Sequence, residues 1–256
     1  MRSQIAFIKK EFLEHIRTGK ALILGMVFLL FGIMNPAVAK LTPWLLGVFA
    51  ESLEGTGITV GEVSISALDS WMQFYKNIPM GMIVFVLIEG GIFTREYESG
   101  TLILSLTKGF SRPRVIIAKS LVLFVLWSLC YFTCYFTTYA YNAFFWDNSV
   151  AESLGFSVFC WWLFGVFVIS LMVLFSTIAT SIGGVLLGVG GVIFALSVAG
   201  IVEKVNKCLP LKLTDGVSLV CGVSKTDEYG IAILVALVVI ASSFAVSFSI
   251  LGKKQL

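Results

Sequence analysis

Six long apolar runs constrain this chain more than any other feature. Each run approaches or exceeds the roughly 20 apolar residues that a helix needs to cross a bilayer. The apolar residues are continuous and do not alternate, which argues against the strands of a membrane barrel. We therefore expect an all-α integral membrane protein, a single domain over residues 1–256. Its six transmembrane helices are expected at about 21–41, 77–94, 115–139, 158–180, 183–202 and 230–251.

The composition favours a membrane protein over a soluble one. Charged residues make up 13% of the chain, about half of their usual share in soluble domains. The hydrophobic fraction is 58%. So few charges cannot cover the surface of a water-soluble globule of this size, and the lipid bilayer is the expected surrounding. The net charge of +3 is too small to indicate a nucleic-acid partner.

The distribution of basic residues predicts the orientation in the membrane. Most of the 18 lysine and arginine residues lie in the N-terminal segment, in the connection after the second span and at the C-terminus. Cytoplasmic connections of membrane proteins carry an excess of such residues. Both termini are therefore expected in the cytoplasm, as an even number of spans requires, and the expected location is the cell membrane.

The first 20 residues form an amphipathic element of their own. Ile5, Ile8, Phe12 and Ile16 recur at the spacing of one helix face. A helix with one apolar and one charged face lies in the plane of the membrane interface, so residues 1–20 are expected to form an interfacial helix. The alternative is a solvated helical tail, which would leave the apolar stripe exposed to water.

Three further features each allow two interpretations. Gly184 and Gly188 form a small-xxx-small pair, which suits either a seam in a dimer or close packing within one subunit. Cys208 and Cys221 share an external loop and could form a disulfide bridge. Residues 37–39 have the form of a signal-peptidase site, but the amphipathic segment before them favours a retained first span.

Glu89 is an ionisable residue inside an expected span. A charge near the middle of a bilayer costs roughly 2.5–3.5 kcal/mol on insertion scales, although Glu89 lies closer to the cytoplasmic edge. One interpretation is a polar element of a transport path or a proton site. The other is a carboxylate paired with a cation at the cytoplasmic edge, such as Arg95.

The residues on which intramembrane enzymes depend are absent from the spans. The chain has one histidine, His15, and it lies in the N-terminal segment. A zinc-binding HExxH motif and a serine–histidine dyad are therefore excluded from the spans. All aspartates lie in loops, and no GxxxxGK[ST] phosphate loop occurs. We expect no catalytic residues and no cofactor or metal bound by this chain.

The connection between the second and third spans carries the most specific signal. Charged residues end the second span, and Gly100 permits a sharp turn. Thr101 can cap a short helix whose apolar face contains Leu102 and Leu106. Gly109 can end this helix. The pattern predicts a short helix that lies across the cytoplasmic face.

In this connection the chain resembles the membrane subunits of type-2 ABC exporters. That family shows Arg-Glu, a further acidic residue and Gly-Thr after the second span, then Ser-Arg and a later lysine at the third. The usual Pro-Val before Ser-Arg is replaced here by Gly109-Phe110. The six spans, the interfacial helix and the cytoplasmic termini agree with the family over the whole chain. The matching residues are Arg95, Glu96, Glu98, Gly100, Thr101, Ser111, Arg112 and Lys119.

The resemblance implies a permease subunit that is not itself an enzyme. It would pair with a second copy or a paralogue and dock on cytoplasmic ABC ATPase subunits, which would bind ATP and Mg. Residues 95–112 would be the coupling helix held by the ATPase. The docking residues would be Arg95, Glu96, Glu98, Gly100, Thr101, Leu102, Leu106 and Arg112.

The sequence allows alternatives for both the cargo and the energy source. In the wider family the cargo is a hydrophobic or amphipathic molecule, such as a peptide, antibiotic or lipid, or an ion. Glu96 and Glu98 could instead pair with Arg95 and Arg112 within the connection. Two other functions are a secondary transporter driven by an ion gradient and a membrane scaffold or sensor without transport.

Overall fold

The computed structural model describes residues 2–52, 65–94 and 112–253. Six helices in this part of the chain are long and apolar enough to span a membrane, which confirms the expected all-α membrane fold. The long helices are α1 (Arg2–Arg17), α2 (Lys20–Ser52), α3 (Ala67–Glu89), α6 (Arg112–Phe145), α7 (Leu154–Ile178), α8 (Ile182–Ala199) and α11 (Gly230–Lys253). The short ones are η1 (Asn148–Val150), α9 (Glu203–Asn206), η2 (Pro210–Thr214), α10 (Gly216–Val220) and η3 (Thr226–Tyr229).

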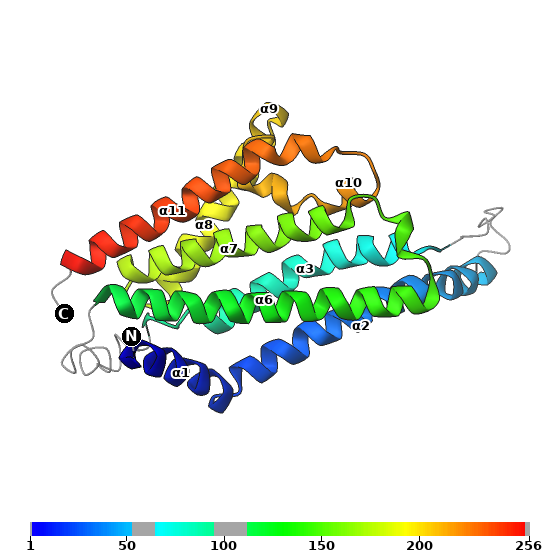
Figure 1. Cartoon of the computed structure of the whole chain (residues 1–256). Helices are drawn as coiled ribbons and strands as arrows, with labels where there is room; N and C mark the ends of the chain where they lie inside the picture. Colours follow the sequence, from blue (N-terminus) through cyan, green and yellow to red (C-terminus); the bar gives the residue numbers. More distant parts are fainter. Residues whose placement is uncertain (1, 53–64, 95–111, 254–256) are drawn as a thin grey trace.

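The six spanning helices alternate in direction and form one bundle (Figure 1). Helix α6 contacts α2, α3 and α7, while α8 and α11 pack on α7. The most apolar stretch of α7 is 72% buried and that of α6 is 61% buried, against 11% for α8. Helices α6 and α7 therefore form the centre. The alternation places the start of α2, the end of α3 and the start of α6 at one end of the bundle, which we call the α1 end.

Helix α1 lies at an angle to α2 and beside the first part of α6 (Figure 1). The bend is made by Thr18 and Gly19, and Gly19 adopts a φ of +73°, which favours glycine. In this position, only part of the predicted apolar stripe is packed against the bundle. Ile8 and Phe12 pack against the core, whereas Ile5 and Ile16 are exposed. The exposed pair suits contact with lipid, and the interfacial position of α1 stays a prediction.

The first two spans are longer than the expected 21–41 and 77–94, so the segment between them is shorter than these bounds implied. Helix α2 continues to Ser52 with Pro36 and Pro43 inside it, as transmembrane helices allow when neighbouring groups satisfy the freed carbonyls. Helix α3 begins at Ala67 because Ser66 caps it: Leu68 N–H donates to Ser66 Oγ, and Ser66 N–H donates to the Asp69 carboxylate. Asp69 therefore starts the helix, although its charge suggested a loop.

The Gly184 and Gly188 pair packs within the subunit. A side chain at Gly188 would collide with the ring of Phe175 in α7. One at Gly184 would lie 2.8 Å from Cβ of Ala179. These contacts agree with the second interpretation of the pair, and a dimer seam at this position stays a prediction.

The far end of the bundle is covered by the short helices between α8 and α11. The indole N–H of Trp161 donates to the carbonyl of Thr214 at 2.8 Å, and the hydroxyl of Tyr229 donates to the carbonyl of Asp215 at 3.0 Å. Cys208 and Cys221 are free, exposed thiols in this cap. The possible bridge between them is thus not formed.

Candidate functional site

An ion pair between α1 and α6 is buried at the α1 end. Lys119 Nζ lies 2.8 Å from Glu11 Oε2, and each side chain is 2% exposed. The same ammonium donates to the carbonyl of Ile92 at 3.1 Å. Ile92 lies three residues after Glu89, the last residue of α3, so one lysine joins α1, α6 and the segment at the end of α3. Buried charges are tolerated only when they are paired and hydrogen-bonded in this way.

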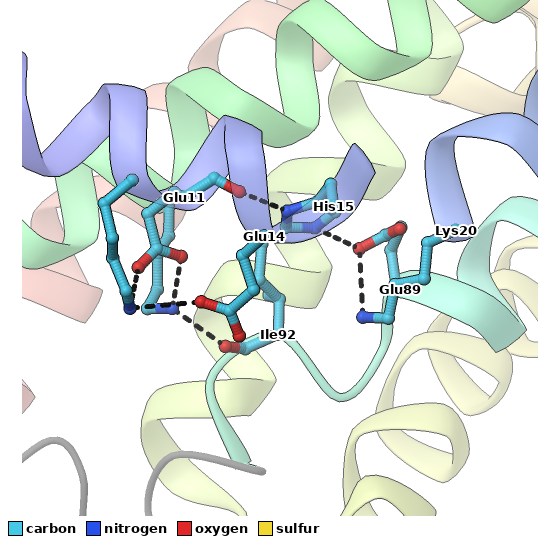
Figure 2. Close-up of polar contacts among 8 residues, drawn as sticks. Glu11, Glu14, His15, Lys20, Glu89 and Ile92 are labelled. Carbon is cyan, nitrogen blue, oxygen red and sulfur yellow. Dashed lines mark hydrogen bonds and ion pairs between the residues drawn. The ribbon is translucent and has the colours of Figure 1, made fainter. Parts of the chain in front are cut away.

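A second buried pair lies beside the first. His15 Nε2 is 2.9 Å from Glu89 Oε2, and His15 Nδ1 is 2.8 Å from the carbonyl oxygen of Glu11. Lys20 Nζ lies 3.8 Å from the same oxygen of Glu89. Figure 2 shows the His15 ring between the Glu11 backbone and the Glu89 carboxylate, with Lys20 on the far side of that carboxylate. This pair ties α1 to α3.

The local sequence explains why these side chains meet. Phe7, Glu11 and His15 are spaced by four residues, so they share one face of α1, and all three are buried. Phe7 packs against Val115 and Ala118 of α6. This inward face is distinct from the apolar stripe, so α1 presents one face to the bundle and another to its surroundings.

Gly90 allows α8 to approach the end of α3 closely. A side chain at Gly90 would lie 2.8 Å from the carbonyl of Val86 and 3.2 Å from Cδ2 of Leu186 in α8. The glycine therefore allows Leu186 to approach the chain directly after Glu89, which is fully buried.

The two titratable groups on α1 have shifted pKa values. Burial by itself raises the pKa of Glu11, but the charge and hydrogen bond of Lys119 outweigh it and hold that pKa below its usual range. Burial lowers the pKa of His15, but the hydrogen bond and charge of Glu89 outweigh it and raise that pKa above 6.5. Both shifts favour the charged forms.

A polar cavity of about 70 Å³ adjoins the two pairs. Glu14, Thr18, Lys20 and Lys119 are among its lining residues. Oε1 of Glu89 is buried without a hydrogen-bond partner among the described residues. The cavity is large and polar enough to hold water beside the two pairs.

We call Glu11, His15, Lys20, Glu89 and Lys119 the ionic cluster. Glu89 is thus paired, as one interpretation of the sequence proposed, but its described partners are His15 and Lys20. Lys119, one of the matching residues noted in the sequence, also lies in this cluster, whereas Arg112 is the first residue of α6. The other predicted docking residues, Arg95, Glu96, Glu98, Gly100, Thr101, Leu102 and Leu106, lie outside the described residues.

Sequence reasoning missed Glu11 and the role of His15. Both lie in residues 1–20, for which the sequence indicated only the apolar stripe of an interfacial helix. The available signal was their spacing of four residues, which places a carboxylate and the chain's one histidine on the same face. That spacing indicates a polar face on the helix, but it does not identify the residues of other helices that pair with this face.

Comparison with known proteins gives one match. A family described as "ABC-2 family transporter protein" matches residues 5–207, which include nearly all of α1, five of the six spans and every member of the ionic cluster. No curated protein and no solved structure matches the chain.

Proposed function

Because the chain belongs to the ABC-2 family of transporter proteins, we propose that it is the permease subunit of an ATP-driven exporter. ATP hydrolysis would take place on separate cytoplasmic ABC ATPase subunits. The cargo would be a hydrophobic or amphipathic molecule, such as a peptide, antibiotic or lipid, or an ion. The α1 end of the bundle would face the cytoplasm, in agreement with its lysine and arginine residues.

The observation that carries this proposal is the place of the ionic cluster. Residues 95–111 lie between the end of α3 and the start of α6, and Lys119 joins both of these elements to Glu11 of α1. His15 and Glu89 make a second connection between α1 and α3. A force applied by an ATPase to this connection would therefore reach α1 through buried contacts and would move it with the spans.

The permease would act as a dimer with a second copy or a paralogue. Helices α8 and α11 leave most of their apolar surface exposed, and so does the outer face of α2. These faces provide room for lipid and for a second subunit.

The docking claim is tested by co-purification with the ATPase subunit. Glu96→Lys reverses a charge proposed to face the ATPase, and Gly100→Pro removes the turn before the coupling helix. Each change is expected to abolish retention of the ATPase by a permease that still inserts in the membrane. Glu203→Lys, the same reversal on exposed α9 at the far end, should retain it. Normal retention by both test variants would contradict docking at residues 95–112.

Reconstitution separates this function from the alternatives. Proteoliposomes that contain the permease and its ATPase should hydrolyse ATP faster in the presence of cargo. Transport by this chain alone, without nucleotide, would instead indicate a secondary transporter. If the permease neither transports nor binds an ATPase, the scaffold or sensor is the better description.

A further inference from the structure

We propose that His15 and Glu89 form a proton-binding site that fastens α1 to the end of α3 while it holds one shared proton and releases this contact when the proton leaves. The inference goes beyond the proposed function and does not depend on it. Both residues belong to this chain, so the site can be tested without an ATPase, and its failure would leave the transport proposal standing.

The hydrogen bonds of His15 determine how many protons the pair holds. The carbonyl of Glu11, 2.8 Å from Nδ1, can only accept, so Nδ1 carries a hydrogen. Nε2 lies 2.9 Å from Glu89 Oε2, and a hydrogen bond across that distance needs one further proton. That proton resides either on the imidazolium or on the carboxylic acid. The pair therefore binds one exchangeable proton.

Loss of that proton leaves the ring with one N–H for two acceptors, the carbonyl of Glu11 and the carboxylate of Glu89. With the hydrogen on Nδ1, the lone pair of Nε2 faces a carboxylate oxygen across 2.9 Å and the contact becomes a repulsion. With the hydrogen on Nε2, the contact loses the charge of the imidazolium and the repulsion falls on the carbonyl of Glu11. Both side chains are almost fully buried, so bulk water would not screen the repulsion. A movement of α1 away from the end of α3 removes this repulsion at the lowest cost in free energy, since Glu89 is held within the bundle.

The other charges around the pair largely cancel, so the shared proton determines the charge balance of the contact between His15 and Glu89. Glu11 is neutralised by Lys119 at 2.8 Å, and Glu14 by Lys10 at 3.1 Å. Lys20, 3.8 Å from Glu89 Oε2, compensates the carboxylate when His15 is neutral. The charged side chains that line the adjoining cavity, besides His15, are Glu11 and Glu14 of α1, Lys20 of α2 and Lys119 of α6.

The polar cavity provides the route for the proton. Its lining includes His15 and Gly91, which lies two residues after Glu89. Oε1 of Glu89, for which the described part of the chain provides no hydrogen-bond partner, can accept a hydrogen bond from a water molecule when the shared proton leaves.

The direction of the pH dependence follows from the raised pKa of His15. Burial alone would lower that pKa, but Glu89 outweighs burial and raises it above 6.5. A raised pKa in the folded chain means that the contact is at full strength below pH 6.5 and is lost as pH rises through the pKa of His15. The contact between α1 and the end of α3 is therefore strongest at acidic pH and weakest at alkaline pH.

The titration can be measured directly because the chain has a single histidine. We would purify the full chain without a polyhistidine tag, label its imidazole nitrogens with ¹⁵N and place it in lipid nanodiscs. NMR from about pH 5 to about pH 9 covers the range in which histidine titrates. We expect one transition with a pKa above 6.5. A pKa at or below that of free histidine would overturn the proposal.

Two variants show whether Glu89 holds the proton. Glu89→Gln is expected to lower the pKa of His15 by roughly one to three units, the usual effect of removing a close opposite charge. Glu14→Gln removes a carboxylate from the same cavity, but this side chain is 51% exposed and pairs with Lys10, so it should move the pKa of His15 much less. Equal shifts in the two variants would overturn the assignment to Glu89.

Hydrogen exchange tests the release of α1. Above the pKa of His15, amides of α1 should exchange faster relative to those of α7, which serves as the internal reference for the effect of pH on exchange chemistry. His15→Gln should remove this difference and provides a readout even where Glu89→Gln fails to fold. If α1 follows α7 at every pH in the wild-type chain, the release is refuted.

Discussion

Replacement of Lys119 by methionine is expected to destabilise the folded chain by about 3–5 kcal/mol, the usual cost of removing one partner of a buried ion pair. The loss leaves the Glu11 carboxylate buried without its ammonium, and the carbonyl of Ile92 loses the hydrogen bond that it accepts at 3.1 Å. The effect should appear as a lower free energy of unfolding of the purified chain in detergent.

Two further variants test whether burial of the ion pair causes the loss of stability in Lys119→Met. Lys10→Met removes a lysine that also pairs with Glu11, at 3.0 Å, but is 51% exposed; exposed pairs contribute about 0–1 kcal/mol, so a small loss is expected. The double change Glu11→Met with Lys119→Met removes both charges and should recover much of the stability, because apolar replacements of a buried pair are often neutral. Similar losses for Lys10→Met and Lys119→Met would show that burial of the pair is unimportant.

Substitution of Gly165 by alanine is the second change for which we expect a large effect. A Cβ at this position in α7 would collide with the indole ring of Trp127 in α6. The ring cannot easily move, because it is fully buried, donates a hydrogen bond to the carbonyl of Trp162 at 3.2 Å and packs edge-on against Phe85. Overpacking of this kind costs typically 1–3 kcal/mol, and sometimes more. Thermal unfolding of the purified variant measures it.

The matched control is Gly190→Ala in α8. A Cβ there has no atom within 4 Å, and alanine favours a helix over glycine, so no loss of stability is expected. Trp127→Phe should partly rescue Gly165→Ala, because the smaller ring frees space beside α7. If Gly165→Ala unfolds at the same temperature as Gly190→Ala, α6 and α7 do not pack as closely as the structure indicates.

The sequence predicted the number of spans and the all-α fold because both depend on local properties. The length and apolarity of a run decide whether a helix can cross the bilayer, whatever it packs against. The ends of helices were less predictable. Residues 42–76 were expected to form a connection, yet Pro43 lies inside α2 and Asp69 lies in the first turn of α3, where its carboxylate accepts from the backbone N–H of the N-cap Ser66. Groups near a helix end or a proline can satisfy the backbone groups that are left free there.

The pairing of residues within the ionic cluster could not be predicted from the sequence. Glu89 was singled out because a carboxylate in an apolar run is costly. Its partner His15 is 74 residues away, and Lys119 is 108 residues from Glu11. The sequence by itself thus determined that a charge would need compensation at this depth. Only the tertiary structure decided which groups provide it, because the packing of α1 across α3 and α6 brings together side chains that no local pattern connects.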